Sequence, residues 1–305
     1  MPIADVKGVK IAYDMRGPAG APAILLIMGL GTQMIAWSDP FCDALAAGGY
    51  RVVRFDNRDV GLSSKFDRAG SVNVKWAFFK SMLGLSIDAP YSLYDMAGDA
   101  VGLMDVLGLE NAHIVGASMG GMIAQIIASK YPARTRSLVS IMSTSGARGL
   151  PQATRDARNA LLAKRPAPGE RDKIIAQMMD IYRVIGSPGY PVPDDHLRQR
   201  MEASLARAYY PVGIGRQMLA IMADGSRVDR LRAIKVPTLV IHGADDPLVP
   251  VAGGKDTAAN IPGAKLEIVP GMGHDLPPGL VPVLAGLILD HCHAVDQTAR
   301  EPVPA

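Results

Sequence analysis

A serine lies between small residues at a point in the chain where a nucleophile can be presented. The run Gly116–Gly121 contains Ser118 and separates an apolar stretch at 113–116 from a second one at 120–130. These stretches predict a strand and a helix, so the serine stands at a tight strand-to-helix turn. The flanking glycines allow the chain segments of such a turn to approach one another. The start of a helix favours negative charge, so the sequence predicts Ser118 as a nucleophile rather than part of a plain glycine–serine loop.

A serine hydroxyl reacts poorly by itself and needs a base that a third group orients. Among the six histidines, His274 is the one in a loop, 270–275, that contains glycines and follows a predicted strand. These glycines give the backbone the freedom to bring the imidazole over the edge of the sheet. We therefore predict His274 as the base. The other histidines are expected in structural or surface positions: His113, His196, His242, His291 and His293.

Two adjacent aspartates offer the third group. Asp245 and Asp246 follow the predicted strand 238–243 and precede Pro247. One carboxylate is expected to hold the imidazole, and the other to cap a turn or face solvent. Proline biases the residue before it toward an extended backbone, which helps to project the carboxylate of Asp246. The residues by themselves leave both aspartates open.

The segments that position these side chains alternate between β-rich runs and helical patterns. We expect strands at 10–15, 23–28, 51–56, 113–116, 137–142, 238–243 and 266–269, and helices at 41–48, 91–107, 120–130 and 280–292. The run Ala23–Met28 is apolar throughout, as in a strand that is buried on both faces. The alternation predicts an α/β fold with a mostly parallel sheet and helices on both faces.

The alternation stops between residues 146 and 236. This stretch shows four helical patterns, at 152–164, 171–185, 195–208 and 212–223, with prolines and glycines between them. We expect a helical cap at 146–236 over a core formed by 1–145 and 237–295, and a flexible tail at 296–305. The cap methionines would either line an adaptable apolar pocket or pack the cap helices together. They are Met178, Met179, Met201, Met218 and Met222.

Composition limits the partners. With 305 residues and 49% apolar residues the chain can bury a large core, and its 32 basic and 29 acidic residues form no basic block, which argues against nucleic acid. No uninterrupted apolar run has membrane-spanning length and the first residues lack a signal-peptide layout, so we expect a cytoplasmic protein without membrane insertion. Cys42 and Cys292 lack metal-ligand spacing and are expected to be reduced, with a distant disulfide as the alternative. The sequence leaves open whether the chain forms a homo-oligomer.

Taken together, the runs 116–121, 242–247 and 271–274 resemble the α/β-hydrolase superfamily, and the likeness covers about residues 10–289. The resemblance implies an eight-stranded sheet, with the helical cap inserted after the sixth strand. It also implies Asp246 as the acid, because the aspartate before such a proline usually has that role in the superfamily. The runs 28–33 and 54–64 resemble the branch that contains aclacinomycin methylesterase and related bacterial carboxylesterases. Many relatives have His-Gly where this chain has Met28-Gly29, which removes a loop-ordering histidine.

The resemblance implies that the backbone N–H groups of Leu30 and Met119 stabilise the oxyanion, and that no metal or organic cofactor is needed. The polar run Asp56–Asp59 is expected to cross-link loops beneath the site rather than to bind substrate. Four side chains are candidates for the substrate pocket: Gln33 and Trp37, which follow the loop that contains Leu30, and Tyr209 and Tyr210 from the cap.

These features predict a serine carboxylesterase that hydrolyses small to medium hydrophobic esters through an acyl-enzyme on Ser118. The nearest alternative is a lactonase for acyl-homoserine lactones or enol-lactones, because a cyclic ester needs the same groups. A cofactor-free perhydrolase would share the same three side chains, and a hydrolase-like ligand receptor is the non-catalytic alternative. Dehalogenases and epoxide hydrolases of this fold place an aspartate at the nucleophile position, so Ser118 argues against both.

Overall fold

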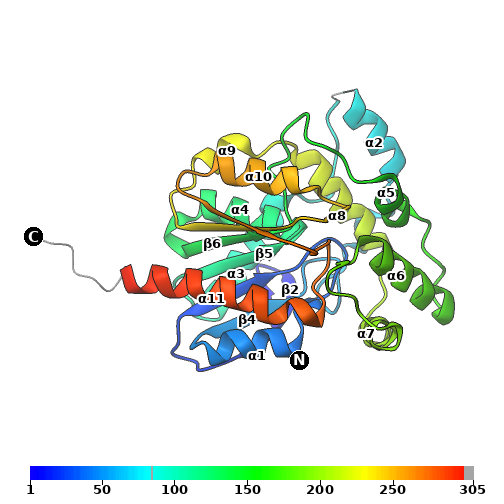
Figure 1. Cartoon of the computed structure of the whole chain (residues 1–305). Coiled ribbons are helices and arrows are strands. Elements are labelled where there is room, and N and C mark those ends of the chain that lie inside the picture. The colour runs from blue at the N-terminus through cyan, green and yellow to red at the C-terminus, as the bar shows by residue number, and fades with distance from the viewer. Residues whose placement is uncertain (84, 299–305) are drawn as a thin grey trace, which may run out of the picture.

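A computed structural model describes residues 1–83 and 85–298 of the chain. Eight strands form one sheet in the order β1-β2-β4-β3-β5-β6-β7-β8 (Figure 1). They are β1 (Ile3–Val6), β2 (Val9–Arg16), β3 (Ala23–Ile27), β4 (Arg51–Phe55), β5 (Ala112–Ala117), β6 (Thr135–Ile141), β7 (Thr238–Gly243) and β8 (Lys265–Val269). The pairs β1–β2 and β2–β4 are antiparallel, and the other five pairs are parallel. The predicted α/β class and mostly parallel sheet are confirmed.

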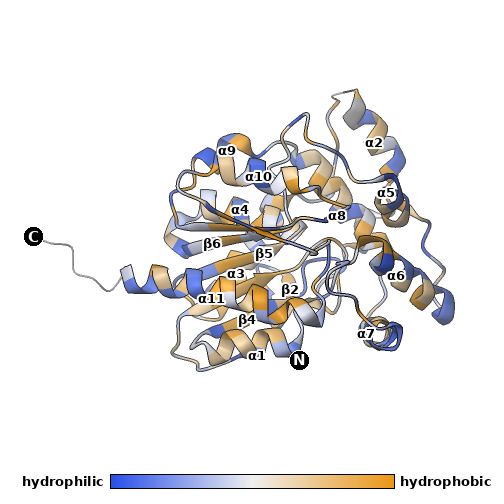
Figure 2. Cartoon of the chain, viewed as in Figure 1, coloured by the Kyte–Doolittle hydropathy of each residue, from blue (hydrophilic) through white to orange (hydrophobic). Residues whose placement is uncertain are grey.

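Helices cover both faces of this sheet (Figure 1). They are α1 (Asp39–Ala47), α2 (Val74–Met82), α3 (Leu93–Val106), α4 (Met119–Lys130), α5 (Arg155–Leu162), α6 (Arg171–Ile185), α7 (Asp194–Arg207), α8 (Pro211–Asp224), α9 (Val228–Arg232), α10 (Val251–Asn260) and α11 (Val281–Thr298). One core layer packs α3, α4 and α9 on the sheet, and the other packs α1 and α11. Figure 2 shows the apolar residues gathered where strands and helices face one another.

Helices α5 to α8 lie between β6 and β7 in the chain and form the group on the right of Figure 1. A small core of their own holds α6 and α7 together: Ile175, Met179, Leu197 and Met201 are all buried in it. Met178 packs against the same cluster. For these three methionines the structure therefore shows the packing role, because their side chains fill the space between two cap helices.

Four elements were not predicted: β1, α2, α9 and α10. β1 has four residues and α9 has five, too few for a periodic pattern to stand out. In α10 the pair Gly253-Gly254 argues against a helix by propensity. The glycines are there for contact, because a Cβ on Gly254 would lie 2.4 Å from Nδ1 of His242.

The tail was predicted to be flexible from residue 296, but α11 continues to Thr298. Asp296 is buried and accepts hydrogen bonds from the Tyr50 hydroxyl at 3.1 Å and from Nη2 of Arg136 at 2.6 Å. These contacts hold the last turns of the helix against β6. The rest of the predicted tail, 299–305, lies outside the described residues.

The segment Pro278–Thr298 is long and apolar enough, at a mean hydropathy of 1.4, to cross a membrane by length and composition. In this structure α11 packs against α1 and β6, and Leu284, Ala285 and Ile288 are buried there. Its apolar face is therefore part of the core of the fold. Cys42 and Cys292 are both buried as free thiols, with no disulfide between them.

Candidate active site

Ser118 occupies a strained turn between β5 and α4. Its backbone has φ of 56° and ψ of −120°, a conformation that residues other than glycine rarely adopt. The neighbouring glycines make the turn sterically feasible. A Cβ on Gly116 would lie 2.1 Å from the carbonyl oxygen of Gly120, and a Cβ on Gly120 would lie 2.0 Å from that of Ile27. The turn therefore presents the serine at the carboxyl end of a buried strand.

Three predicted side chains form one hydrogen-bonded chain at this edge of the sheet. Nε2 of His274 lies 3.0 Å from Oγ of Ser118, and Nδ1 of His274 lies 2.7 Å from Oδ2 of Asp246. They come from the loops after β5, β7 and β8, which end at the same edge because these strands are parallel. With a proton on Nδ1 donated to the carboxylate, Nε2 is free to accept the serine proton.

The structure separates the two aspartates. Asp246 is buried, and its Oδ1 accepts the backbone N–H groups of Leu248 at 2.9 Å and Val249 at 2.8 Å. Asp245 is exposed and accepts the N–H of Gly271 at 2.9 Å. This contact is the turn-capping role that was expected for the aspartate that does not hold the imidazole. The histidine thus contacts the aspartate that the two backbone N–H groups hold in place.

His242 lies beside Asp246 without joining the chain to the serine. Its Nε2 donates to the carbonyl oxygen of Val249 at 2.7 Å and lies 3.6 Å from Oδ2 of Asp246. Burial lowers the pKa of His242. This effect outweighs the hydrogen bond to Val249 and the charge of Asp246, which both act to raise the pKa. The neutral imidazole is a packed structural group, in agreement with its interpretation from the sequence.

A second buried carboxylate, Asp275, follows the histidine and was missed by sequence reasoning. Oγ of Ser187 donates to it at 2.5 Å and accepts the N–H of Gly273 at 2.9 Å. Burial raises the pKa of Asp275 and outweighs the opposing hydrogen bond from Ser187. The N–H of His274 donates to the carbonyl oxygen of Ile185 at 2.7 Å. The loop that carries the histidine is therefore held by the last residue of α6 and by the segment after it, which no pattern in the linear sequence indicated.

The loop after β3 runs beside the serine. A Cβ on Gly29 would lie 3.1 Å from Cβ of Ser118, so the two backbones are close. Within the described residues, the N–H groups of Leu30 and Met119 donate to no carbonyl or side chain, which leaves both available to a ligand. Nδ2 of Asn57 donates to the carbonyl oxygen of Met28 at 2.9 Å and helps to hold this loop.

The polar run after β4 cross-links loops, as expected. Asp56 accepts the N–H groups of Met34 at 2.8 Å and Leu62 at 2.9 Å. Arg58 forms a bidentate pair with Asp99 at 2.6 and 2.7 Å. Asp59 and Arg216 are both fully buried, and their shortest contact is 2.7 Å.

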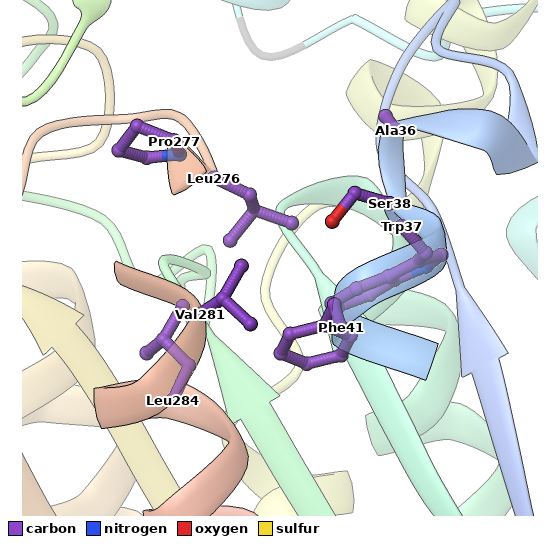
Figure 3. A pocket seen from close by; sticks show the side chains of 8 residues that line it. All are labelled: Ala36, Trp37, Ser38, Phe41, Leu276, Pro277, Val281 and Leu284. Carbon is purple, nitrogen blue, oxygen red and sulfur yellow. The ribbon is translucent and has the colours of Figure 1, made fainter. Parts of the chain in front are cut away.

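Two of the four predicted pocket residues are committed to other contacts. Trp37 is fully buried and stacks on Phe41 with ring centroids 5.1 Å apart. It lines a cavity of about 10 Å³ next to Leu276 and Val281, which Figure 3 shows and which holds no more than about one water. The amide of Gln33 is used by α7: Nε2 donates to the carbonyl oxygens of Ser204 and Ala208, and Oε1 accepts from Arg207. Both side chains thus make contacts within the fold, and their role toward a substrate stays a prediction.

The two tyrosines come from the segment between α7 and α8. The hydroxyl of Tyr209 donates to the carbonyl oxygen of Pro166 at 2.9 Å. The hydroxyl of Tyr210 donates to Asp67 and accepts from Nη2 of Arg216 at 2.6 Å. Their role toward a substrate stays a prediction. Among residues 1–83 and 85–298, no group of three or more His, Cys, Asp or Glu side chains is arranged to hold a metal ion.

Comparison with known proteins agrees with this fold. A model of the α/β hydrolase fold family matches residues 22–174. Rhodomycin D methylesterase from a Streptomyces species is 28% identical over 91% of this chain and 92% of its own length. A putative carbamate hydrolase from Variovorax paradoxus is 30% identical over 87% of this chain and 90% of its own. The enol-lactonase of Burkholderia xenovorans has the same fold, with a TM-score of 0.70 at 22% identity over 96% of this chain and all of its own. This chain is an enzyme of the α/β hydrolase family.

Proposed function

We propose that this enzyme is a serine esterase that hydrolyses small to medium hydrophobic carboxylic esters through an acyl-enzyme on Ser118. The observation that carries the proposal is the continuous chain from Oγ of Ser118 through His274 to Asp246, with contacts of 3.0 and 2.7 Å. A hydroxyl at a strained turn, a base in contact with it and a buried carboxylate behind the base are the groups that acyl transfer needs.

In the first half-reaction Oγ of Ser118 attacks the ester carbonyl carbon while Nε2 of His274 takes the hydroxyl proton. Asp246 holds the imidazole in the required tautomer and stabilises its positive charge. The negative charge moves to the carbonyl oxygen, where the N–H groups of Leu30 and Met119 can donate to it. The tetrahedral intermediate collapses, and the alcohol leaves with the proton from His274.

In the second half-reaction His274 takes a proton from water, which attacks the acyl carbon. The same two N–H groups receive the second oxyanion. Collapse breaks the bond to Oγ, the proton returns to Ser118, and the carboxylic acid leaves. In this scheme His274 mediates every proton transfer, and the two backbone N–H groups donate hydrogen bonds to the oxyanion.

The assignment to esters draws on the named methylesterase relative, which aligns with nine-tenths of this chain. Carbamates and enol-lactones, named for the other two proteins, present the same acyl carbon to a nucleophile. A lactone is a cyclic ester that these steps would open without loss of the leaving group. We take the open-chain ester as the principal substrate class and the lactone as the competitor to be measured.

Hydrolysis of p-nitrophenyl esters with acyl chains of two to twelve carbons tests the proposal. We expect turnover by the wild-type enzyme and a drop on the order of 10⁶-fold in kcat for Ser118→Ala. Ser129→Ala is the matched control, because its hydroxyl bonds to a carbonyl within α4 at 3.1 Å and is remote from the imidazole. Turnover that survives in Ser118→Ala would refute the mechanism.

Two further measurements define the chemistry. A p-nitrophenyl phosphonate should add covalently to Ser118, and peptide mass spectrometry should find the adduct in the wild type and in Ser129→Ala but not in Ser118→Ala. Lactones of graded ring size, followed by acid release, test the substrate class. Lactone opening much faster than cleavage of any open-chain ester would replace the esterase assignment with a lactonase.

A further inference from the structure

One glutamine in the cap contacts the loop that would stabilise the oxyanion. Gln217, on α8, is fully buried. Its Oε1 accepts the N–H of Gly31 at 2.8 Å, and its Nε2 donates to the carbonyl oxygen of Arg58 at 2.8 Å. A single amide thus connects a cap helix with the loop after β3 and with the loop after β4.

Packing adds to these hydrogen bonds. Gly31 has φ of 63°, and a Cβ on it would lie 2.7 Å from Cγ1 of Ile214. Ile214 precedes Gln217 by three positions, so both side chains lie on the same face of α8. The loop after β3 therefore rests directly on that helix face, with no room for a side chain at Gly31.

The hydrogen bonds of this loop fix the peptide units on both sides of Leu30. The carbonyl oxygen of Gly29 accepts the N–H of Thr32 at 3.3 Å, and that of Leu30 accepts Oγ1 of Thr32 at 3.1 Å. The peptide unit between Leu30 and Gly31 is planar, so Gln217 and Thr32 hold its two ends. The N–H of Leu30 lies in the neighbouring peptide plane, between Gly29 and Leu30. The two planes meet at the α-carbon of Leu30, so the orientation of this N–H depends on how the Leu30–Gly31 plane is held.

Helix α8 is itself firmly held by the core. Arg216, next to Gln217, forms a pair with Asp59 in which both side chains are fully buried. A Cβ on Gly213 would lie 2.3 Å from the carbonyl oxygen of Asp59, so the start of the helix touches the same loop. The glutamine amide is therefore presented from a rigid element, which is the condition for a preorganised donor site.

We propose that Gln217 is a positioning residue for the oxyanion site: its amide holds the Leu30–Gly31 peptide so that the N–H of Leu30 is directed at the developing charge. This inference rests on the proposed esterase mechanism and adds to it a residue from the cap. In the proposed mechanism Gln217 touches no reacting atom. Its effect is expected on the transition state and not on the binding of the ground-state ester.

Three variants test the proposal. Gln217→Met keeps the size of the side chain and removes both hydrogen bonds. Gln217→Glu, when protonated, again offers one acceptor and one donor. Gln125→Met is the control, because Gln125 is a buried glutamine that bonds to Ser140 at 3.1 Å and Arg227 at 3.0 Å and has no contact with the oxyanion loop.

For Gln217→Met we expect kcat to fall on the order of 10- to 100-fold while KM changes less than about threefold. Measured relative to the wild type at the same pH, Gln217→Glu should recover activity as the pH is lowered and the buried carboxyl becomes protonated, which a loss of general stability would not produce. Gln125→Met should leave kcat within about twofold of the wild type.

Inhibitor binding distinguishes a failure of the positioning role from a failure of the esterase mechanism. A trifluoromethyl ketone, which places an oxyanion in the site after addition of Ser118, should lose affinity in Gln217→Met by the same factor as kcat/KM, while the matching non-reactive ether binds equally to both proteins. A Gln217→Met enzyme with wild-type kcat and ketone affinity would overturn the positioning role and leave the esterase intact. A wild-type enzyme that neither hydrolyses esters nor binds the ketone would overturn both.

Discussion

At the scale of single residues, the reactivity of Ser118 depends on which side chain orients His274. Asp246 presents one carboxylate oxygen to Nδ1 of the imidazole and the other to two backbone N–H groups. Asp245, its neighbour in the chain, points to Gly271 instead. Two chemically identical groups are thus assigned different roles by their surroundings.

Replacing each aspartate by asparagine gives a matched pair. Asp246→Asn should lower kcat by about 10⁴-fold, because the amide can donate to Nδ1 and so stabilise the wrong tautomer of His274. Asp245→Asn keeps an acceptor for the Gly271 N–H at an exposed position, and kcat should stay within about twofold. Steady-state rates with one p-nitrophenyl ester measure both. Equal losses, or a larger loss in Asp245→Asn, would contradict the assignment.

At the scale of elements, α11 is joined to the sheet through a buried polar group. His113 on β5 contacts Ser137 on β6 at 2.8 Å and Asp296 on α11 at 3.2 Å. Burial lowers the pKa of His113 to about 4 and outweighs the opposing charge of Asp296. For Asp296, burial acts to raise the pKa, but His113 and Arg136 lower it overall.

This arrangement predicts a loss of stability in acid. Unfolded His113 binds a proton below about pH 6.5, whereas the folded protein leaves it neutral down to about pH 4. Unfolding therefore takes up a proton in that interval, and the free energy of unfolding should fall by about 2 kcal/mol from pH 7 to pH 5 through this group. Urea titrations of the wild type and His113→Gln at both pH values measure it. The variant should show a smaller drop, and parallel pH curves would speak against the shifted pKa.

The buried pair between α8 and the loop after β4 is the second test at this scale. Arg216→Met leaves the carboxylate of Asp59 buried without its cation, so the free energy of unfolding should fall by about 3 to 5 kcal/mol. Arg183→Met removes an exposed partner of Asp180 and Asp194, and its effect on the free energy of unfolding should be far smaller, because solvent screens that pair. Urea unfolding of the two variants compares them directly, and similar losses would mean that α8 is not held by this pair.

At the scale of the whole molecule, cap and core meet at the loop that carries the histidine. The N–H of Gly189 donates to the carbonyl oxygen of Gly271 at 2.9 Å, in addition to the contact between His274 and Ile185. A Cβ on Gly273 would lie 2.3 Å from the carbonyl oxygen of Gly186. The position of the imidazole is therefore decided jointly by two parts of the chain.

Two glycine substitutions test this joint control. Gly273→Ala forces the loop away from the cap, and a displacement of about 1 Å should lower kcat/KM about 100-fold. Gly286→Ala, on α11, meets no atom within 4 Å and should leave the rate unchanged while it raises the free energy of unfolding by about 0.5 to 1 kcal/mol. Esterase rates and thermal unfolding measure both variants. Wild-type activity in Gly273→Ala would show that the cap loop does not position the histidine.

Local patterns in the sequence were sufficient for seven of the eight strands and for the residues with distinctive surroundings. The alternation of apolar strands and amphipathic helices depends on neighbours in the chain, and so does the need for glycine around Ser118. His274 was found in the same way, from the glycines next to it. Helix α10 was missed because Gly254 is needed for a close contact with His242, and that contact follows from the fold and not from local propensity.

Other features depend on contacts between distant segments, which a single sequence does not list. Gln217 and Gly31 are 186 residues apart, and Ser187 and Asp275 are 88 apart. The sequence cannot distinguish Trp37 in the core from Trp37 in a pocket, because either position suits an apolar side chain. The sequence by itself thus determined the fold class and the turn that carries Ser118, because both depend on short-range patterns. Only the tertiary structure decided which aspartate meets the histidine and which residue of α8 holds the loop after β3, because those are questions of distance across the folded chain.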